Sequence, residues 1–134
     1  MSDHEHPPTV WPALRYADAP GAIRFLVDAF GFDERCRHTG SSEQLVEHAE
    51  LRWPAGGGVM LGSTDRDDSE FSRGPTGTGS VYVVTDRVAE VFERAHAVGA
   101  EVVRPLEDKP YGGRGGTLRD PEGNLWSFGS YRGT

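Results

Sequence analysis

A repeat within this 134-residue chain constrains its fold more than any other feature. The stretches ALRYADAPGAIRFLVDAFGF and VYVVTDRVAEVFERAHAVGA both run from a strand-like pattern through an acidic residue into an amphipathic segment that ends at a glycine. Asp18 precedes Gly31 by 13 positions, and Asp86 precedes Gly99 by the same number, so the offset is 68 residues. An acidic residue can cap or lead into a first helical turn, and glycine suits the left-handed position after the last one. The repeat therefore predicts a strand followed by a helix in each half.

Three strand candidates follow each predicted helix. They cover residues 33–40, 45–53 and 57–62 in the first half and residues 101–108, 115–120 and 124–129 in the second. Each half is therefore expected to be a β-α-β-β-β module, which places the chain in the α+β fold class. One such module leaves one face of its sheet uncovered by its own helix. We expect the two tandem modules to form a concave, mostly antiparallel eight-stranded sheet around a shared cleft.

Changes in composition mark the boundaries of the modules. The start is polar, and residues 62–80 are rich in glycine, serine and aspartate, as linkers are. We assign a disordered tail to residues 1–8, the first module to 9–62, a linker to 63–78 and the second module to 79–130. His4 and His6 could capture a metal ion adventitiously, but a plain disordered tail is the favoured interpretation.

Charge and cysteine content exclude several classes of function. The formal net charge is −7, which argues against nucleic acid as a partner because phosphate binding favours a basic surface. No apolar run reaches the roughly 20 residues of a membrane span, and the start lacks the pattern of a secretory signal, so we expect a cytoplasmic protein. Cys36 is the only cysteine, which argues against an intrachain disulfide and a cysteine-based metal cluster. We interpret Cys36 as a bystander rather than a nucleophile.

The closing motif YGGRGGTLRDPEGNLWSF, together with AIRFLVDAFGF, EHAEL and VMLG, resembles the vicinal-oxygen-chelate superfamily. That superfamily includes glyoxalase I, extradiol dioxygenases and bleomycin-resistance proteins, and the chain is most similar to its compact bacterial glyoxalase/bleomycin-resistance-like members. The resemblance implies a concave eight-stranded sheet that is usually completed by dimerisation, so we expect a homodimer. It also implies one divalent metal held by His, Glu or Gln side chains from the first and last strands of each module.

The positions that match the superfamily's metal ligands hold other residue types here. They correspond to Trp11 and Gly79 on the first strands, to Ser127 on the last strand of the second module and, most nearly, to Leu61 on that of the first. None of these residues offers the carboxylate that hard divalent cations prefer. We therefore expect no metal and no cofactor in the cleft, and Ser127 stands where a metal enzyme of the superfamily would present Glu.

Side-chain alternation along the first strands selects residues that would line the cleft instead. If Trp11 faces the cleft, Arg15 lies on the same side, and the second module turns Val81 and Val83 toward it. Trp11 is then a stacking platform for a flat or cationic ligand. Plain burial of Trp11 after the tail is the alternative.

The strand EHAELRW predicts a polar trio on the concave face. If Ala49 and Leu51 pack on the helix, then His48, Glu50 and Arg52 face the cleft. His48 could act on a bound ligand or serve as a general base. A hydrogen-bonded or solvated histidine is the alternative.

The glycine-rich segment PYGGRGGTLRD resembles a loop that closes over the cleft of the superfamily. Its glycines permit a close backbone approach to a ligand, and it lacks the pattern of a phosphate-binding P-loop. Arg114 binds an anionic group in one interpretation and fixes the loop to a carboxylate in the other, and Tyr111 is a further candidate contact. Trp126 and Phe128, which flank Ser127, are expected in the core.

These residues predict a metal-free protein that binds a small organic molecule, with a drug or natural product as the expected ligand. Such binding needs shape, apolar surface and a few placed polar groups, but no reactive centre. Catalytic residues are not assigned. The alternative is a lyase, isomerase or dioxygenase of the same superfamily. In it, His48 and Glu50 would serve either as displaced metal ligands or as acid and base.

Overall fold

The computed structural model describes residues 8–64, 75–110 and 112–133. The first half contains, in order, β1 (Ala13–Tyr16), α1 (Ala19–Phe25), a π-helical turn η2 (Leu26–Phe30), β2 (Asp33–Thr39), β3 (Val46–Arg52) and β4 (Gly58–Ser63). The second half contains β5 (Ser80–Val84), α2 (Val88–Ala97), β6 (Glu101–Asp108), β7 (Arg114–Arg119) and β8 (Leu125–Gly129). Both halves therefore have the predicted β-α-β-β-β order. Among the described residues, no helix is both long and apolar enough to cross a membrane.

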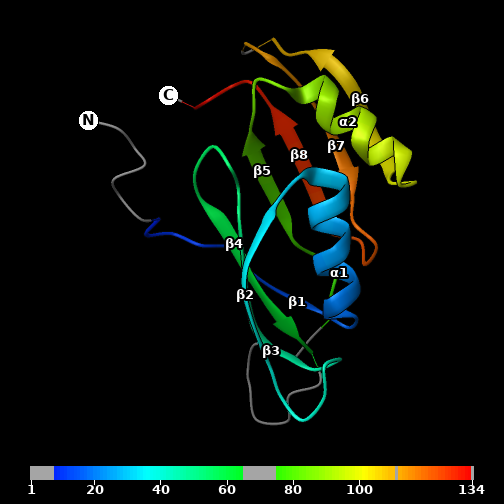
Figure 1. Cartoon of the computed structure of the whole chain (residues 1–134). Helices are drawn as coiled ribbons and strands as arrows, with labels where there is room; N and C mark the ends of the chain where they lie inside the picture. Colours follow the sequence, from blue (N-terminus) through cyan, green and yellow to red (C-terminus); the bar gives the residue numbers. More distant parts are fainter. Residues whose placement is uncertain (1–7, 65–74, 111, 134) are drawn as a thin grey trace.

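The strands form two four-stranded sheets, one from each half of the chain (Figure 1). The strand orders are β1-β4-β3-β2 and β5-β8-β7-β6, so the first and last strands of each half lie side by side. These first and last strands run parallel, and the other neighbouring strands run antiparallel. The α+β fold is as expected, with the eight strands divided between two mixed sheets.

The repeated glycine ends both helices in the predicted way, but only the first of the two repeated acidic residues caps its helix. Asp18 is the N-cap of α1, and its side chain accepts a hydrogen bond from the amide of the third residue after it at 3.1 Å. Asp86 lies one residue before the N-cap of α2 and pairs with Arg132 at 2.7 Å. Gly31 and Gly99 have φ values of 89° and 80°, which glycine adopts without strain.

The two helical segments differ in length by one residue, and this difference reverses the faces of β5. The N-cap precedes the left-handed glycine by 13 positions in the first module and by 12 in the second. A π-helical turn takes in an extra residue, and η2 is such a turn. When the two modules are compared at the glycine that ends each helix, β5 is therefore out of step with β1 by one residue. A shift of one residue exchanges the two faces of a strand. The prediction for Val81 and Val83 was wrong: both lie opposite buried residues of β8, while Tyr82 is 47% exposed.

One apolar core joins the two modules. Ala49 and Leu51 are fully buried, as alternation in β3 predicted. Phe30 in η2 belongs to the first module but packs on β8 of the second, with ring centroids 5.5 Å from Trp126 and 4.8 Å from Phe128. Both of these aromatic residues have no exposed surface, which confirms their predicted place in the core.

The turn between β7 and β8 fastens the second module to the first. Asp120 is 3% exposed, and its carboxylate accepts five hydrogen bonds of 2.6–3.1 Å. Three donors are side chains, from Tyr16, Asn124 and Trp126, and two are backbone amides of the turn. The carboxylate of Glu122 accepts hydrogen bonds from the backbone amides of the two residues after β1, at 2.7 and 2.8 Å. The DPEGN turn therefore holds the modules together as well as reversing the chain.

Replacing Tyr16 by phenylalanine tests this connection. Tyr16 is fully buried, and its hydroxyl donates to Asp120 at 2.6 Å. Loss of a hydrogen bond to a charged group is expected to lower the free energy of unfolding by about 1.5–3 kcal/mol. Urea unfolding of wild type and Tyr16→Phe near pH 7 measures this difference.

The difference in the free energy of unfolding between wild type and Tyr16→Phe is expected to narrow in alkaline solution. Burial and then the negative charge of Asp120 raise the pKa of Tyr16 well above its ordinary value of about 10. Because the folded-state pKa is raised, the contribution of the neutral hydroxyl is complete below about pH 10 and falls as pH rises beyond it. A difference that grows above pH 10, or a variant as stable as wild type at pH 7, would contradict the role of this bond.

Candidate functional site

One face of the second sheet is not covered by the core, and it is called the bare face here. It carries a row of paired residues, one from each strand. Arg104 of β6 lies opposite Thr117 of β7, and Ser127 of β8 lies between Thr117 and Tyr82 of β5. Side chains of directly paired residues share a face of a sheet. Ser127 therefore faces away from its two buried neighbours in β8, as expected. The hydroxyl oxygens of Thr117 and Ser127 are hydrogen-bonded at 2.8 Å.

A cavity of about 140 Å³ opens beside this row and is lined by three cationic side chains, those of Arg104, Lys109 and Arg114. Lys109 is paired with a neighbouring carboxylate at 3.0 Å. Within the part of the chain that the structure describes, Arg104 and Arg114 have no ion pair. The structure thus brings the predicted residues Arg114 and Ser127 to one cavity, and that cavity is cationic on a chain of net charge −7.

Tyr82 forms one wall of the cavity and is held there by the C-terminal segment. Its hydroxyl donates a hydrogen bond to the backbone carbonyl of Tyr131 at 2.5 Å. Gly129 leaves the space that the Tyr82 ring occupies, because a Cβ at this glycine would lie 2.6 Å from the hydroxyl oxygen. An aromatic ring, two hydroxyl groups and three cations therefore surround the cavity.

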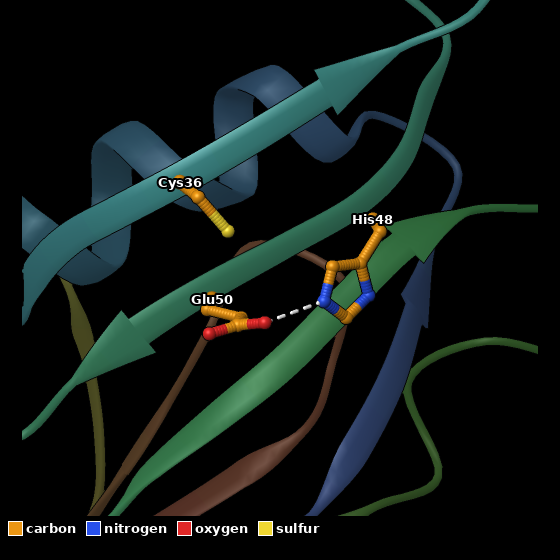
Figure 2. A group of neighbouring side chains, drawn as sticks. All are labelled: Cys36, His48 and Glu50. Atoms are coloured by element: carbon orange, nitrogen blue, oxygen red, sulfur yellow. Dashed lines mark hydrogen bonds and ion pairs between the residues drawn. The ribbon is translucent and has the colours of Figure 1, made fainter.

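The bare face of the first sheet carries the predicted polar trio of β3. His48, Glu50 and Arg52 are partly exposed, and the residues between them are buried. Nε2 of His48 donates to a carboxylate oxygen of Glu50 at 2.8 Å (Figure 2). His48 is therefore hydrogen-bonded within the protein, and it is also partly exposed on the face where a ligand was predicted to bind.

Trp11 lies next to this trio, and Arg52 covers one face of its ring. The guanidinium carbon of Arg52 is 5.6 Å from the ring centroid, which is a cation–π contact. The indole of Trp11 donates to the carbonyl of Pro8 at 3.2 Å. Arg15 is half-buried on β1, beside Gly62 of β4. Trp11 thus stacks with a cation of the protein itself.

Cys36 joins the group on the first sheet, which the sequence did not indicate. Glu34 pairs with Leu51, but Cys36 pairs with Glu50, so Arg35 is an extra residue that bulges from β2. Without this bulge, Arg35 would lie opposite Glu50. Burial and then the negative charge of Glu50 raise the pKa of the Cys36 thiol. A raised pKa disfavours the thiolate form that a nucleophile needs.

Leu61 does not lie where the sequence predicted. Leu61 does not face the cleft, because it pairs with buried Ala49 and is 1% exposed. Met60 instead pairs with Glu50 and shares its face. The match of the last strand was displaced by one residue, and Met60 is the counterpart of Ser127. Tyr111 lies outside the described residues.

Several residues that line the cavity were missed from the sequence, among them Tyr82, Arg104, Lys109, Thr117 and Tyr131. Thr117 could have been found, because the DPEGN turn between β7 and β8 sets the register that pairs it with Ser127. Arg104 could not, because irregular pairing in β6 places it there. Tyr82 was assigned to the wrong face through the helix-length difference described above.

A comparison with known families identifies the fold. The family model of the Glyoxalase/Bleomycin resistance protein/Dioxygenase superfamily matches residues 9–128. The chain belongs to this superfamily. The resemblance that the closing motif indicated is thereby confirmed.

Relatives and structural neighbours of the protein match nearly the whole chain. An uncharacterized protein of Mycobacterium tuberculosis is 34% identical over 126 residues, which span 91% of this chain and 74% of the relative. The crystal structure of TioX from Micromonospora sp. ML1 is similar with a TM-score of 0.77 and 35% identity, over 91% of this chain and 97% of TioX. A superfamily member from Sphaerobacter thermophilus is similar in fold, with a TM-score of 0.68 and 21% identity, over 91% of this chain and 97% of the other.

The positions at which the superfamily resemblance implies a metal do not fit a divalent cation in this chain. Of the positions matched from the sequence, Trp11 stacks with Arg52, and Gly79 has no side chain. On the bare faces, the first and last strands present Ala13 beside Met60 and Tyr82 beside Ser127. These four side chains supply no carboxylate and no imidazole. The cationic residues around Ser127 would also repel a metal ion.

Proposed function

We propose that this protein binds a small organic molecule that carries an anionic group, and that the group enters the cationic cavity of the second sheet. The observation that carries the proposal is the placement of Arg104, Lys109 and Arg114 around the hydroxyl groups of Thr117 and Ser127. Cations gathered at one point of an acidic protein indicate a local requirement for negative charge in the ligand.

The lining residues suit recognition of a planar oxyanion such as a carboxylate. A guanidinium group presents parallel N–H donors that match the two oxygens of such a group. Thr117 and Ser127 share one hydrogen bond, which leaves one hydroxyl proton to donate to the ligand. The exposed ring of Tyr82 offers a surface for an aromatic part of the molecule.

The size of the cavity limits which part of the ligand it receives. Pockets that enclose a whole drug-sized molecule measure about 300–1,000 Å³, and this cavity measures about 140 Å³. It therefore takes the anionic end of the molecule, and the remainder lies over the bare sheet. The superfamily's description includes bleomycin resistance proteins, which supports a drug or natural product as the ligand.

Calorimetric titration of the full chain with aromatic carboxylates and their uncharged amides tests this proposal. Carboxylates are expected to bind at least about tenfold more tightly than the matched amides. Arg104→Gln and Arg114→Gln are each expected to weaken carboxylate binding by about tenfold, which equals about 1.4 kcal/mol.

Arg24→Gln is the matched control, because Arg24 is an exposed arginine on α1 that does not line the cavity. It should bind carboxylates as wild type does. Equal binding of carboxylates and amides would refute the proposal. The same conclusion would follow if both cavity variants bound as the control does.

A further inference from the structure

Three side chains that can ligate transition metals converge on the bare face of the first sheet. Cys36 comes from β2, and His48 and Glu50 come from β3 (Figure 2). The sulfur of Cys36, a ring nitrogen of His48 and a carboxylate oxygen of Glu50 all lie within 4.8 Å of one another. We propose that these three residues bind a zinc ion.

The set of donor atoms suits zinc. Zinc takes thiolate, imidazole and carboxylate ligands at about 2.0–2.3 Å, usually in tetrahedral geometry. Those bond lengths place the ligand atoms about 3.3–3.7 Å apart, so small side-chain rotations bring the three groups around one ion. Magnesium and calcium prefer oxygen ligands alone. Binding of the ion displaces the proton of the Cys36 thiol to solvent, and the resulting thiolate and the Glu50 carboxylate together balance the charge of the ion.

The bulge in β2 builds this arrangement. The extra residue Arg35 places Cys36, and not a cationic side chain, opposite Glu50. The hydrogen bond of 2.8 Å between His48 and Glu50 already holds two of the ligands side by side. Bulges commonly re-aim a side chain next to a functional site. The local irregularity therefore assembles three ligands from two neighbouring strands.

The cluster is accessible to an ion from solvent. The side chains of His48 and Glu50 are 40% and 33% exposed. Three protein ligands at an exposed site leave the fourth position of a tetrahedral zinc ion to water. His38 pairs with His48 across the strands, with ring centroids 6.2 Å apart, and flanks the cluster without belonging to it.

This site is separate from the superfamily's metal positions and from the cationic cavity. The superfamily resemblance places metal ligands on the first and last strands of each module, whereas these residues lie on the second and third strands of the first module. The cationic cavity is on the other sheet. The zinc site therefore goes beyond the proposed function, and either one can fail without the other.

Titration of the full chain with cobalt tests the site through the sulfur. A bond between Co²⁺ and a thiolate gives a near-ultraviolet charge-transfer band that nitrogen and oxygen ligands do not give. Cys36 is the only cysteine of the chain, so the band reports on this residue alone. The titration is made on a parent chain carrying His4→Ala and His6→Ala, which removes two competing histidines. We expect one cobalt ion per chain, the thiolate band, and loss of the band when zinc is added.

Variants of the ligands extend the test. Cys36→Ser is expected to abolish the band. His48→Gln and Glu50→Gln are each expected to weaken zinc binding by at least about tenfold in competition with a chromogenic chelator. The matched control is His96→Gln, which alters an exposed histidine of α2 and should bind as the parent does. Circular dichroism checks that each variant is folded.

Two results on the parent chain would overturn the proposal without any ligand variant. One is the absence of zinc binding at micromolar concentrations. The other is cobalt binding without the thiolate band, because Cys36 would then not be a ligand. A His48→Gln variant that binds zinc as tightly as His96→Gln would also contradict it.

Discussion

Replacing Asp120 by alanine is expected to lower the free energy of unfolding by about 3–5 kcal/mol. The carboxylate of Asp120 accepts five hydrogen bonds in an almost fully buried place. Alanine would leave the buried donors of Tyr16 and Trp126 without this acceptor. Each buried donor left unsatisfied costs about 1–3 kcal/mol, and the turn would lose the bonds that shape it. The variant is therefore destabilised locally and across the contact between the modules.

Urea unfolding of wild type, Asp120→Ala and Asp108→Ala measures the effect. Asp108 is exposed on β6, and its replacement should change the free energy of unfolding by no more than about 0.5 kcal/mol. Asp120→Asn keeps the shape of the side chain but removes its charge, and we expect an intermediate loss. If Asp120→Ala loses no more than the Asp108 control, the turn does not hold the modules as described.

Phe30→Ala is expected to lower the free energy of unfolding by about 3–5 kcal/mol, because it leaves a cavity where side chains of both modules pack. The Phe30 ring is 2% exposed, and its centroid lies 5.1 Å from Phe25 in the first module and 4.8 Å from Phe128 in the second. Removal of the ring leaves a cavity, and it also removes aromatic contacts with β8. Thermal or urea unfolding measures the loss.

Phe30→Leu serves as the graded control for this second variant. It keeps most of the apolar volume and should cost clearly less than Phe30→Ala. Two equal losses would point to the edge-to-face ring contacts, and not the filled volume, as the main contribution of Phe30. A loss below about 1 kcal/mol in Phe30→Ala would contradict a core that is shared between the modules.

The secondary structure could be predicted because its determinants are local. Turn residues and alternation placed β6 at residues 101–108, and the structure has it at Glu101–Asp108. Asp18 and Gly31 marked the ends of the first helical segment through capping chemistry that needs only neighbouring residues. The polar trio on β3 could be predicted because side chains alternate between the two faces of a strand.

The composition of the candidate sites was harder to predict, because single-residue irregularities decide which side chains meet. The π-helical turn η2 shifted the comparison of the two modules by one position, and Tyr82 was therefore assigned to the buried face of β5 instead of the bare one. The bulge at Arg35 brought Cys36 to Glu50, although alternation from the start of β2 places Arg35 there. Such irregularities leave no periodic signal in the chain.

The division of the strands into two sheets has a consequence for how two copies of this chain could associate. β1 and β5 each lie at one edge of their sheet, and no strand pairing joins one sheet to the other among the described residues. The hydrogen bonds between modules described above all involve a side chain, as do those of Trp53 with Val84 and of Arg94 with the backbone of residues 27 and 28. Two copies could therefore exchange a half reciprocally and re-form every one of these contacts without breaking a backbone ladder.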